Sequence, residues 1–300
     1  MHRARYSCGV TDRLARTPDG ETLAFRIHGA PGKTPMLTVH GLVSSIEHWS
    51  LFTPHYAQSR PVVSWEFRGH GGQPAPRDCS SVSVAQFADD AHVVARAAEL
   101  PPAIVIGLSF GVQVALEVWR RHRDAVRALV LICGTAGHPL DRVSASPRVR
   151  RTVASVVRGL AGRRAIAQPI LSFARTPRGM HIAREITFWA GGADRETCPL
   201  DVLEKLFDHA GSLAPELFGA VISAYLEHSA WDMLDTIDVP TLIIAGDKDE
   251  LTPVATAERL HRAIAGSELV VFAGHTHLVQ CEQPREVHAA IDDFLSRHAL

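Results

Sequence analysis

The alternation of apolar runs and amphipathic stretches predicts an α/β protein. Residues 84–100 place apolar side chains at helical spacing, as do residues 112–122, so both stretches predict helices. Short apolar runs between these patterns predict strands. The runs at 103–106 and 126–132 are continuous, which is typical of strands buried on both faces of a parallel sheet. The remaining strands are predicted at 22–28, 36–40 and 61–67.

The alternation stops in the middle of the chain. Residues 138–237 show a mostly helical pattern broken by Gly and Pro. Strand and helix patterns then alternate again, at 240–245, 253–265, 268–272 and 284–298. We therefore predict a core domain of residues 1–137 and 238–300, interrupted by a helical cap domain of residues 138–237. An insert at this point would lie over the carboxyl ends of the strands, where open α/β sheets bind ligands.

Composition excludes several classes of function. The 300 residues carry 31 basic and 32 acidic side chains, and a formal net charge of −1 gives no reason to expect a nucleic acid or a membrane as partner. The five cysteines are scattered and form no C-x-x-C pair, so we expect no disulfide framework and no metal or other cofactor. No secretion signal or membrane-spanning run is evident, which favours a cytoplasmic protein. The composition does not indicate an oligomeric state.

The sequence Gly-Leu-Ser-Phe-Gly at 107–111 is the strongest candidate for chemistry. It follows the predicted strand at 103–106 and opens the predicted helix at 112–122. A strand, a sharp turn and a helix are the context that a G-x-S-x-G nucleophile elbow requires, with Ser109 as the nucleophile. The alternative is a tight turn in which Ser109 only caps the helix.

Two loops supply candidates for a base and an acid. Asp247 and Asp249 follow the strand predicted at 240–245, and His275 and His277 follow the strand predicted at 268–272. A serine nucleophile needs a base, and the base needs an orienting carboxylate. The chain order Ser, Asp, His is the order found in α/β-hydrolases.

Four further motifs extend this pattern: His40-Gly41-Leu42, Arg68-Gly69-His70-Gly71, Gly246-x-x-Asp249-x-x-x-Pro253 and His277-x4-Glu282-x-Pro284. With these motifs, residues 20–298, apart from the cap, resemble the α/β-hydrolase superfamily, in its cap-bearing serine hydrolase and esterase branch. The resemblance implies an α/β-hydrolase fold: a mostly parallel eight-stranded sheet flanked by helices, with the helical cap inserted after the sixth strand.

The resemblance also implies a choice within each loop. The family's acid lies three residues after the glycine, which selects Asp249 and leaves Asp247 to make hydrogen bonds in the turn. The family's histidine lies five residues before the glutamate, which selects His277 and puts His275 at a variable position on the rim. Thr276 departs from the family pattern, which has glycine there.

Two more groups have an expected role, the first from its capping pattern and the second from the resemblance. Thr252 is expected to cap the following helix, with Pro253 at its first position. The backbone N–H groups of Leu42 and Phe110 are expected to form the oxyanion hole. The loop at 133–137 contains no acid, which removes an alternative acid position that some relatives use.

These expectations predict a carboxylesterase-like serine hydrolase that cleaves a small or medium, largely apolar carboxylic ester through an acyl-enzyme. The expected partner is a small-molecule acyl substrate. One alternative is the same triad acting on a C–C bond, a thioester, a lactone or a peracid. Another is a non-catalytic ligand-binding protein of the same fold.

The cap contains one unusual stretch. Residues 147–164 carry six arginines and no acid, and Val149, Val153, Val156 and Leu160 fall on one face of a predicted amphipathic helix. The arginines are expected to form a solvated face. The alternative is that they bind an anionic substrate arm or a carrier protein. The cap's large aromatic side chains, among them Trp189 and Tyr225, are expected mostly to pack the cap onto the core, with a few lining an apolar pocket.

Overall fold

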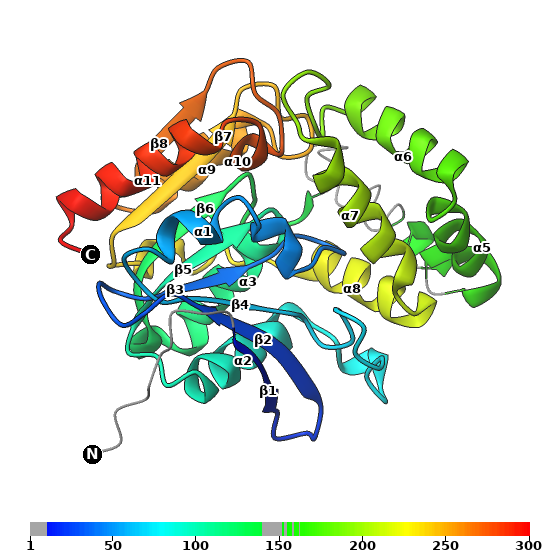
Figure 1. Ribbon diagram of the computed structural model, residues 1–300, viewed down its shortest axis with the longest axis horizontal. Coiled ribbons are helices and arrows are strands. Elements are labelled where there is room, and N and C mark those ends of the chain that lie inside the picture. Colours follow the sequence, from blue (N-terminus) through cyan, green and yellow to red (C-terminus); the bar gives the residue numbers. More distant parts are fainter. Residues whose placement is uncertain (1–10, 140–151, 153–154, 158, 162) are drawn as a thin grey trace.

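An eight-stranded sheet forms the centre of the computed structural model, which describes residues 11–139, 152, 155–157, 159–161 and 163–300 (Figure 1). The strand order is β1-β2-β4-β3-β5-β6-β7-β8. Only β2 runs against its neighbours, and the other pairings are parallel. The strands are β1 (Thr11–Arg16), β2 (Thr22–His28), β3 (Met36–Val39), β4 (Val62–Trp65), β5 (Ala103–Leu108), β6 (Val126–Ile132), β7 (Thr241–Gly246) and β8 (Glu268–Phe272). The predicted mostly parallel eight-stranded sheet is confirmed.

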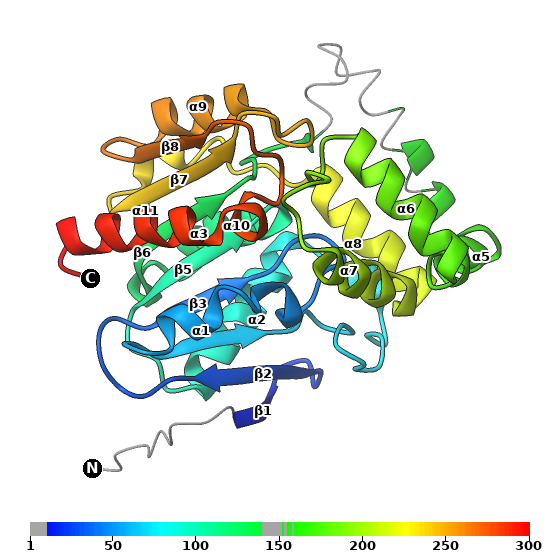
Figure 2. The same ribbon diagram turned by 45° about the horizontal axis from the view of Figure 1, so that its top comes forward.

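The central strands are buried on both faces, as their continuous apolar runs predict. In β5, Val105 belongs to one hydrophobic cluster, whereas Ile104 and Ile106 belong to the other. Figure 2 shows a helical layer on each side of the sheet. One layer contains α2 (Val84–Ala97), α3 (Phe110–Arg121) and α9 (Val254–Ala263), and the other contains α1 (Thr53–Tyr56), α10 (Val279–Glu282) and α11 (Pro284–Arg297).

Four helices follow β6 and precede β7: α5 (Arg164–Ala174), α6 (Pro177–Trp189), α7 (Leu200–Ser212) and α8 (Pro215–Glu227). We call this group the cap, and its position after the sixth strand is the predicted one. Both views show the cap as a separate layer at one end of the sheet (Figures 1 and 2). The domain limits at residues 137/138 and 237/238 stay a prediction. Half of the residues in the helix predicted over 147–164 lie outside the described ones; residues 155–157 and 159–161 are helical, and Val156 and Leu160 of the apolar face are 55% and 47% exposed.

The apolar pattern of the sequence does not predict the first strand, β1. It pairs with β2 over six residues, from Thr11 opposite Ile27 to Arg16 opposite Thr22. Because β1 is an edge strand, it leaves Arg13 and Leu14 exposed and carries little of the apolar alternation that identifies a strand. Short 3₁₀ helices occur at Ile46–Trp49, Cys79–Ser81, Arg123–Ala125 and Leu234–Thr236.

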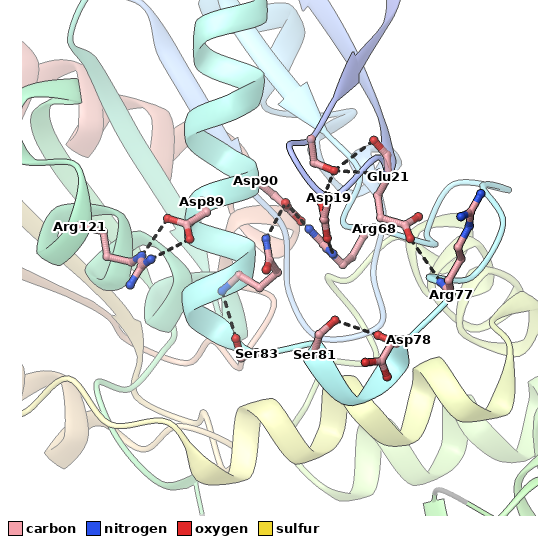
Figure 3. A network of polar contacts seen from close by, with 12 residues as sticks. Asp19, Glu21, Arg68, Arg77, Asp78, Ser81, Ser83, Asp89, Asp90 and Arg121 are labelled. Carbon is pink, nitrogen blue, oxygen red and sulfur yellow. Dashed lines mark hydrogen bonds and ion pairs between the residues drawn. The ribbon is translucent and has the colours of Figure 1, made fainter.

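The arginine of the Arg68-Gly69-His70-Gly71 motif has a structural role. Arg68 is 1% exposed and makes two hydrogen bonds to the Asp90 carboxylate on α2, at 2.7 and 2.6 Å (Figure 3). Its third contact, at 2.9 Å, is to Asp19 in the turn between β1 and β2. A bidentate arginine fixes the relative position of the segments that it joins. Removing either partner would be strongly destabilising, because the other charge would stay buried without compensation. Arg68 thus ties the β1–β2 hairpin to α2, beside the loop that contacts the cap.

Candidate active site

Ser109 lies at a sharp turn between β5 and α3, as the elbow hypothesis requires. Its backbone has φ 55° and ψ −116°, a conformation that L residues rarely adopt. The Ser109 amide donates to the carbonyl of Ile132 at 2.9 Å, and no side-chain hydrogen bond from Ser109 caps α3. The capping alternative is therefore not the observed geometry. Strain at an exposed nucleophile is common in functional sites.

Both glycines of the motif are required by close packing. A Cβ on Gly107 would lie 2.4 Å from the backbone oxygen of Gly111. A Cβ on Gly111 would lie 2.2 Å from the backbone oxygen of Val39 at the end of β3. Neither backbone oxygen can move without shifting a central strand or the start of α3, so both positions need glycine. The elbow is thus specified by sterics as well as by its sequence.

Asp249 and His277 meet Ser109 at the carboxyl edge of the sheet. The ring of His277 bridges the other two residues: its Nε2 lies 2.9 Å from Ser109 Oγ, and its Nδ1 lies 2.8 Å from Asp249 Oδ2. The three residues follow β5, β7 and β8, whose parallel carboxyl ends share this edge. Residues far apart in the sequence are therefore brought together in the geometry of a Ser-His-Asp triad.

The Asp249 carboxylate is stabilised in its ionised form. Burial opposes ionisation, but the contact with His277 and the hydrogen bonds from Thr252 outweigh it, and the pKa of Asp249 is lowered. Oδ1 accepts the backbone N–H groups of Leu251 and Thr252, both at 2.8 Å. Oδ2 accepts the Thr252 hydroxyl at 2.6 Å as well as His277 Nδ1–H. The hydrogen bonds to both oxygens thus hold the carboxylate group in one orientation.

Thr252 differs from its predicted role. Helix α9 begins at Val254 with Pro253 at the N-cap, and its N-terminus receives no side-chain capping bond. The predicted cap at Thr252 is wrong, because the hydroxyl is already committed to the Asp249 carboxylate. The same hydroxyl lies 3.3 Å from His277 Nδ1. Thr252 is therefore a neighbour of the triad, which the capping pattern in the sequence concealed.

The competing Asp247 and His275 lie outside this arrangement. Asp247 was predicted to make hydrogen bonds within its own turn. Its carboxylate instead accepts the backbone N–H of Gly274, in the loop after β8, at 2.6 Å. His275 is not on a rim: its side chain is only 12% exposed, and its Nδ1 lies 3.3 Å from Glu282. Both residues thus support the shape of the two loops.

Glu282 explains the departure at Thr276. The Glu282 carboxylate accepts the Thr276 backbone N–H at 2.9 Å and the Thr276 hydroxyl. It also accepts the backbone N–H of Asp194 at 2.8 Å, from the segment between α6 and α7. A hydroxyl in place of the usual glycine therefore adds a bond to the same buried carboxylate, which fixes the histidine loop and ties it to the cap.

The segment proposed for the oxyanion hole lies close to the nucleophile. Gly41, two residues after β3, lies beside the nucleophile: a Cβ there would be in ordinary contact with Ser109 Cβ, at 3.5 Å. Leu42 lines the same cavity as Ser109, and Phe110 follows Ser109 as the first residue of α3. Val43, the next residue after Leu42, has φ 48°, which is a strained conformation for a β-branched side chain. Leu42 and Phe110 thus both lie close to Ser109, and the oxyanion hole formed by their amides stays a prediction.

A cavity of about 430 Å³ opens beside Ser109 and His277. The core supplies most of its lining, and the cap adds Leu206 from α7 and Tyr225 from α8. Its wall is largely apolar, with side chains of Leu42, Leu108, Leu206, Leu251 and Leu278. A cavity of this size and character suits a small or medium apolar group.

Two polar side chains line this cavity: His48, which was not identified from the sequence, and Tyr225, one of the cap aromatics of which a few were expected to line a pocket. His48 is fully enclosed, and desolvation, with a smaller contribution from His277, lowers its pKa to about 4. Its Nε2 lies 2.9 Å from the amide nitrogen of Gln280, so His48 is neutral and accepts that bond. Burial, with a smaller contribution from Asp249, raises the pKa of Tyr225. No local motif marks either residue: His48 lies in the 3₁₀ helix after β3, and Tyr225 lies in α8 of the cap.

One group of residues in the described ranges could in principle hold a metal ion. Ligand atoms of Cys133, Asp249 and His277 all lie within 4.8 Å of one another. Asp249 and His277 already bond to each other, and burial, together with the nearby Asp249 charge, raises the pKa of the Cys133 thiol well above its usual value. A neutral thiol is a poor metal ligand, so the chemistry of this group favours a triad over a metal centre.

Comparison with known proteins places the chain in a family. Residues 34–284 match the family described as alpha/beta hydrolase fold. This protein is a member of that family. It is 28% identical to a pimeloyl-[acyl-carrier protein] methyl ester esterase of Neisseria meningitidis over 262 residues, which cover 86% of this chain and 91% of that protein. It is 26% identical to monoacylglycerol lipase ABHD6 of Mus musculus over 298 residues, covering 97% of this chain and 84% of that protein.

A solved structure supports the fold. The enol-lactonase from Burkholderia xenovorans superposes with a TM-score of 0.74 at 21% sequence identity, covering 95% of this chain and all of that one. This α/β-hydrolase chain therefore has homologues of the esterase type, and the homology supports an ester-hydrolysing enzyme in general terms.

Proposed function

We propose that this α/β-hydrolase is a serine esterase with Ser109 as nucleophile, His277 as general base and Asp249 as the orienting acid. One observation carries the proposal: His277 lies within hydrogen-bond distance of both Ser109 Oγ and Asp249 Oδ2. A nucleophile, its base and the group that orients the base are what acyl transfer through a covalent intermediate needs.

The reaction would proceed in two halves. His277 Nε2 takes the proton of Ser109 as Oγ attacks the acyl carbonyl, and Asp249 stabilises the imidazolium that forms. The Leu42 and Phe110 amides stabilise the tetrahedral oxyanion, each contributing about 3 kcal/mol by analogy with measured oxyanion holes. His277 then protonates the leaving alcohol. Water activated by the same histidine attacks the acyl-enzyme and releases the carboxylic acid, which regenerates Ser109.

The proposed substrate is a small or medium, largely apolar carboxylic ester. The leucine-lined cavity of about 430 Å³ supports an acyl or alkyl group of that size. The pimeloyl ester esterase and the monoacylglycerol lipase among the relatives are named for ester substrates, which favours an ester over a C–C bond. A lactone is the second candidate, because the enol-lactonase shares the fold and a lactone is an internal ester.

The proposal is tested by hydrolysis of p-nitrophenyl esters from acetate to laurate. We expect wild-type turnover with an optimum at short or medium chains and loss of turnover in Ser109→Ala. Turnover of a lactone series with little turnover of linear esters would favour the second candidate. Ligand retention without turnover of any acyl compound would contradict the proposal and favour a binding protein.

A further inference from the structure

Charge is divided unevenly along the middle of the chain. Residues 142–184 contain ten arginines and no aspartate or glutamate, whereas residues 185–237 contain two basic and ten acidic side chains. The formal net charge of −1 hides this polarity because it averages over the whole chain. The described part of the basic segment contains α5 and most of α6, with five of the ten arginines.

Helix α6 presents an apolar stripe to solvent. Ile182, Ile186 and Trp189 follow one another at intervals of four and three residues, so they share one helical face. Their exposed fractions are 47%, 58% and 89%. The exposed Arg178 lies one turn before Ile182 on the same face. We call these four residues the α6 stripe. Most cap aromatics were expected to pack the cap onto the core, but Trp189 does not.

The neighbouring helix α5 adds to this surface. Its Ile170 and Phe173 are 62% and 47% exposed, and the side chain of Arg164 at its start is 73% exposed, although it lies 3.8 Å from the Glu216 carboxylate. Both views show α5 and α6 as the outermost helices of the cap, on the side away from the sheet (Figures 1 and 2). Several large apolar side chains in a basic setting are unusual on a protein surface that stays in water.

The α6 stripe ends beside the cavity that contains Ser109. Directly after the helix, a Cβ on Gly191 would come within 2.8 Å of the Glu250 side chain, and one on Gly192 within 3.3 Å of Leu251. Leu251 lines that cavity and is itself 46% exposed. The end of α6 thus packs against the segment that contains Leu251, at the rim of the cavity.

We propose that the outward face of α5 and α6 docks onto an anionic lipid surface. A helix with Trp and Ile on one face and arginines around it is the pattern of interfacial helices, which bury the apolar face at the headgroup boundary and attract acidic lipids. The attachment is interfacial, since among the described residues no helix is long and apolar enough to cross a bilayer. This departs from the expectation of no membrane partner, which rested on the averaged charge.

Other occupants fit the α6 stripe less well. A second copy of this chain, docked through the same surface about a two-fold axis, would bring one basic face against another, which is repulsive. An acidic protein would satisfy the arginines, but a bilayer satisfies the arginines and the exposed Trp189 together. The docking does not depend on the proposed esterase activity.

Co-sedimentation with vesicles tests the proposal. Wild type is mixed with vesicles of phosphatidylcholine alone and of phosphatidylcholine with phosphatidylglycerol, at low and high salt. We expect stronger binding to the anionic vesicles and weaker binding at high salt. Ile186→Ser/Trp189→Ser should lower the partition coefficient by about tenfold or more. Arg178→Gln should lower it about fivefold, as expected for one basic residue near an anionic surface.

Matched controls come from β1, which lies at the edge of the sheet and apart from α6 in both views (Figures 1 and 2). Leu14→Ser and Arg13→Gln also change exposed side chains and should leave vesicle binding unchanged. Circular dichroism checks that every variant is folded. The proposal is overturned if wild type binds neither vesicle, or if the α6 variants bind as wild type does. A dimer in sedimentation equilibrium that Trp189→Ser dissolves would assign the surface to a second copy instead.

Discussion

Asp249→Asn separates the electrostatic role of the acid from its role as a scaffold. In the wild type, Oδ1 accepts two backbone N–H groups at 2.8 Å, from Leu251 and Thr252. An asparagine must keep its oxygen at this position, because its NH₂ group can only donate and cannot accept those two bonds. The new NH₂ group therefore points to His277 Nδ1, where the wild type has a carboxylate oxygen at 2.8 Å.

The orientation of the new amide determines the size of the effect. A donor facing Nδ1 stabilises the tautomer of His277 that carries its proton on Nε2, and that nitrogen can no longer accept the Ser109 proton. In serine proteases the equivalent change lowers kcat about 10⁴-fold with the geometry intact. That corresponds to about 5.5 kcal/mol of transition-state stabilisation. We expect a loss of the same order here.

The assay is steady-state hydrolysis of the best p-nitrophenyl ester. Asp247→Asn is the matched control, since Asp247 lies in the same loop and accepts one backbone N–H, from Gly274 at 2.6 Å. Its kcat should stay within a few-fold of wild type. The reasoning is refuted if Asp249→Asn, folded by circular dichroism, loses less than tenfold in kcat, or if Asp247→Asn loses as much.

Three other changes have defined outcomes. Thr252→Val removes a hydroxyl bonded to the Asp249 carboxylate and should lower kcat/KM about tenfold, the value of one charge-assisted hydrogen bond; Thr252→Ser should restore it. Burial raises the pKa of Glu66 to about 7, against an ordinary value of 4.5. The folded protein then holds a proton that the unfolded chain loses, so stability falls as pH rises from 4.5 to 7. In urea unfolding, Glu66→Gln should be more stable than wild type above pH 7, by up to about 3 kcal/mol, with no such gain below pH 4.5; an equal difference at both pH values would contradict this. Leu206→Trp fills the cavity from the cap side and should shift the ester optimum to shorter chains, whereas an unchanged optimum would remove Leu206 from the acyl site.

Local patterns were sufficient to predict the core and the strand-end loops that meet at its edge, but the choice of Asp249 and His277 within those loops came from the resemblance to the family. The strands at 22–28, 126–132 and 268–272 have the predicted limits, because their apolar runs are bounded by turn residues. Ser109, Asp249 and His277 could be predicted because each lies in a strand-end loop, and parallel strands bring those loops to one edge.

The contacts between distant elements could not be predicted in this way. Thr252 matches an N-cap pattern, but a buried carboxylate competes for its hydroxyl, and the tertiary bond forms instead. His48 and Tyr225 enter the cavity from a 3₁₀ helix and from the cap, so no spacing in the sequence relates them to Ser109. The exposure of Trp189 could not be predicted either, because an aromatic residue on an amphipathic helix usually packs against the core.

The most direct test of the central claim is labelling by a fluorophosphonate, with the modified peptide identified by mass spectrometry. Such a probe reacts with a serine activated by a base, whatever the natural substrate is. The account predicts one adduct, on Ser109 of wild type and of His275→Ala, and none in Ser109→Ala or His277→Ala. An adduct on another residue, or labelling of Ser109 that survives His277→Ala and is lost in His275→Ala, would contradict it.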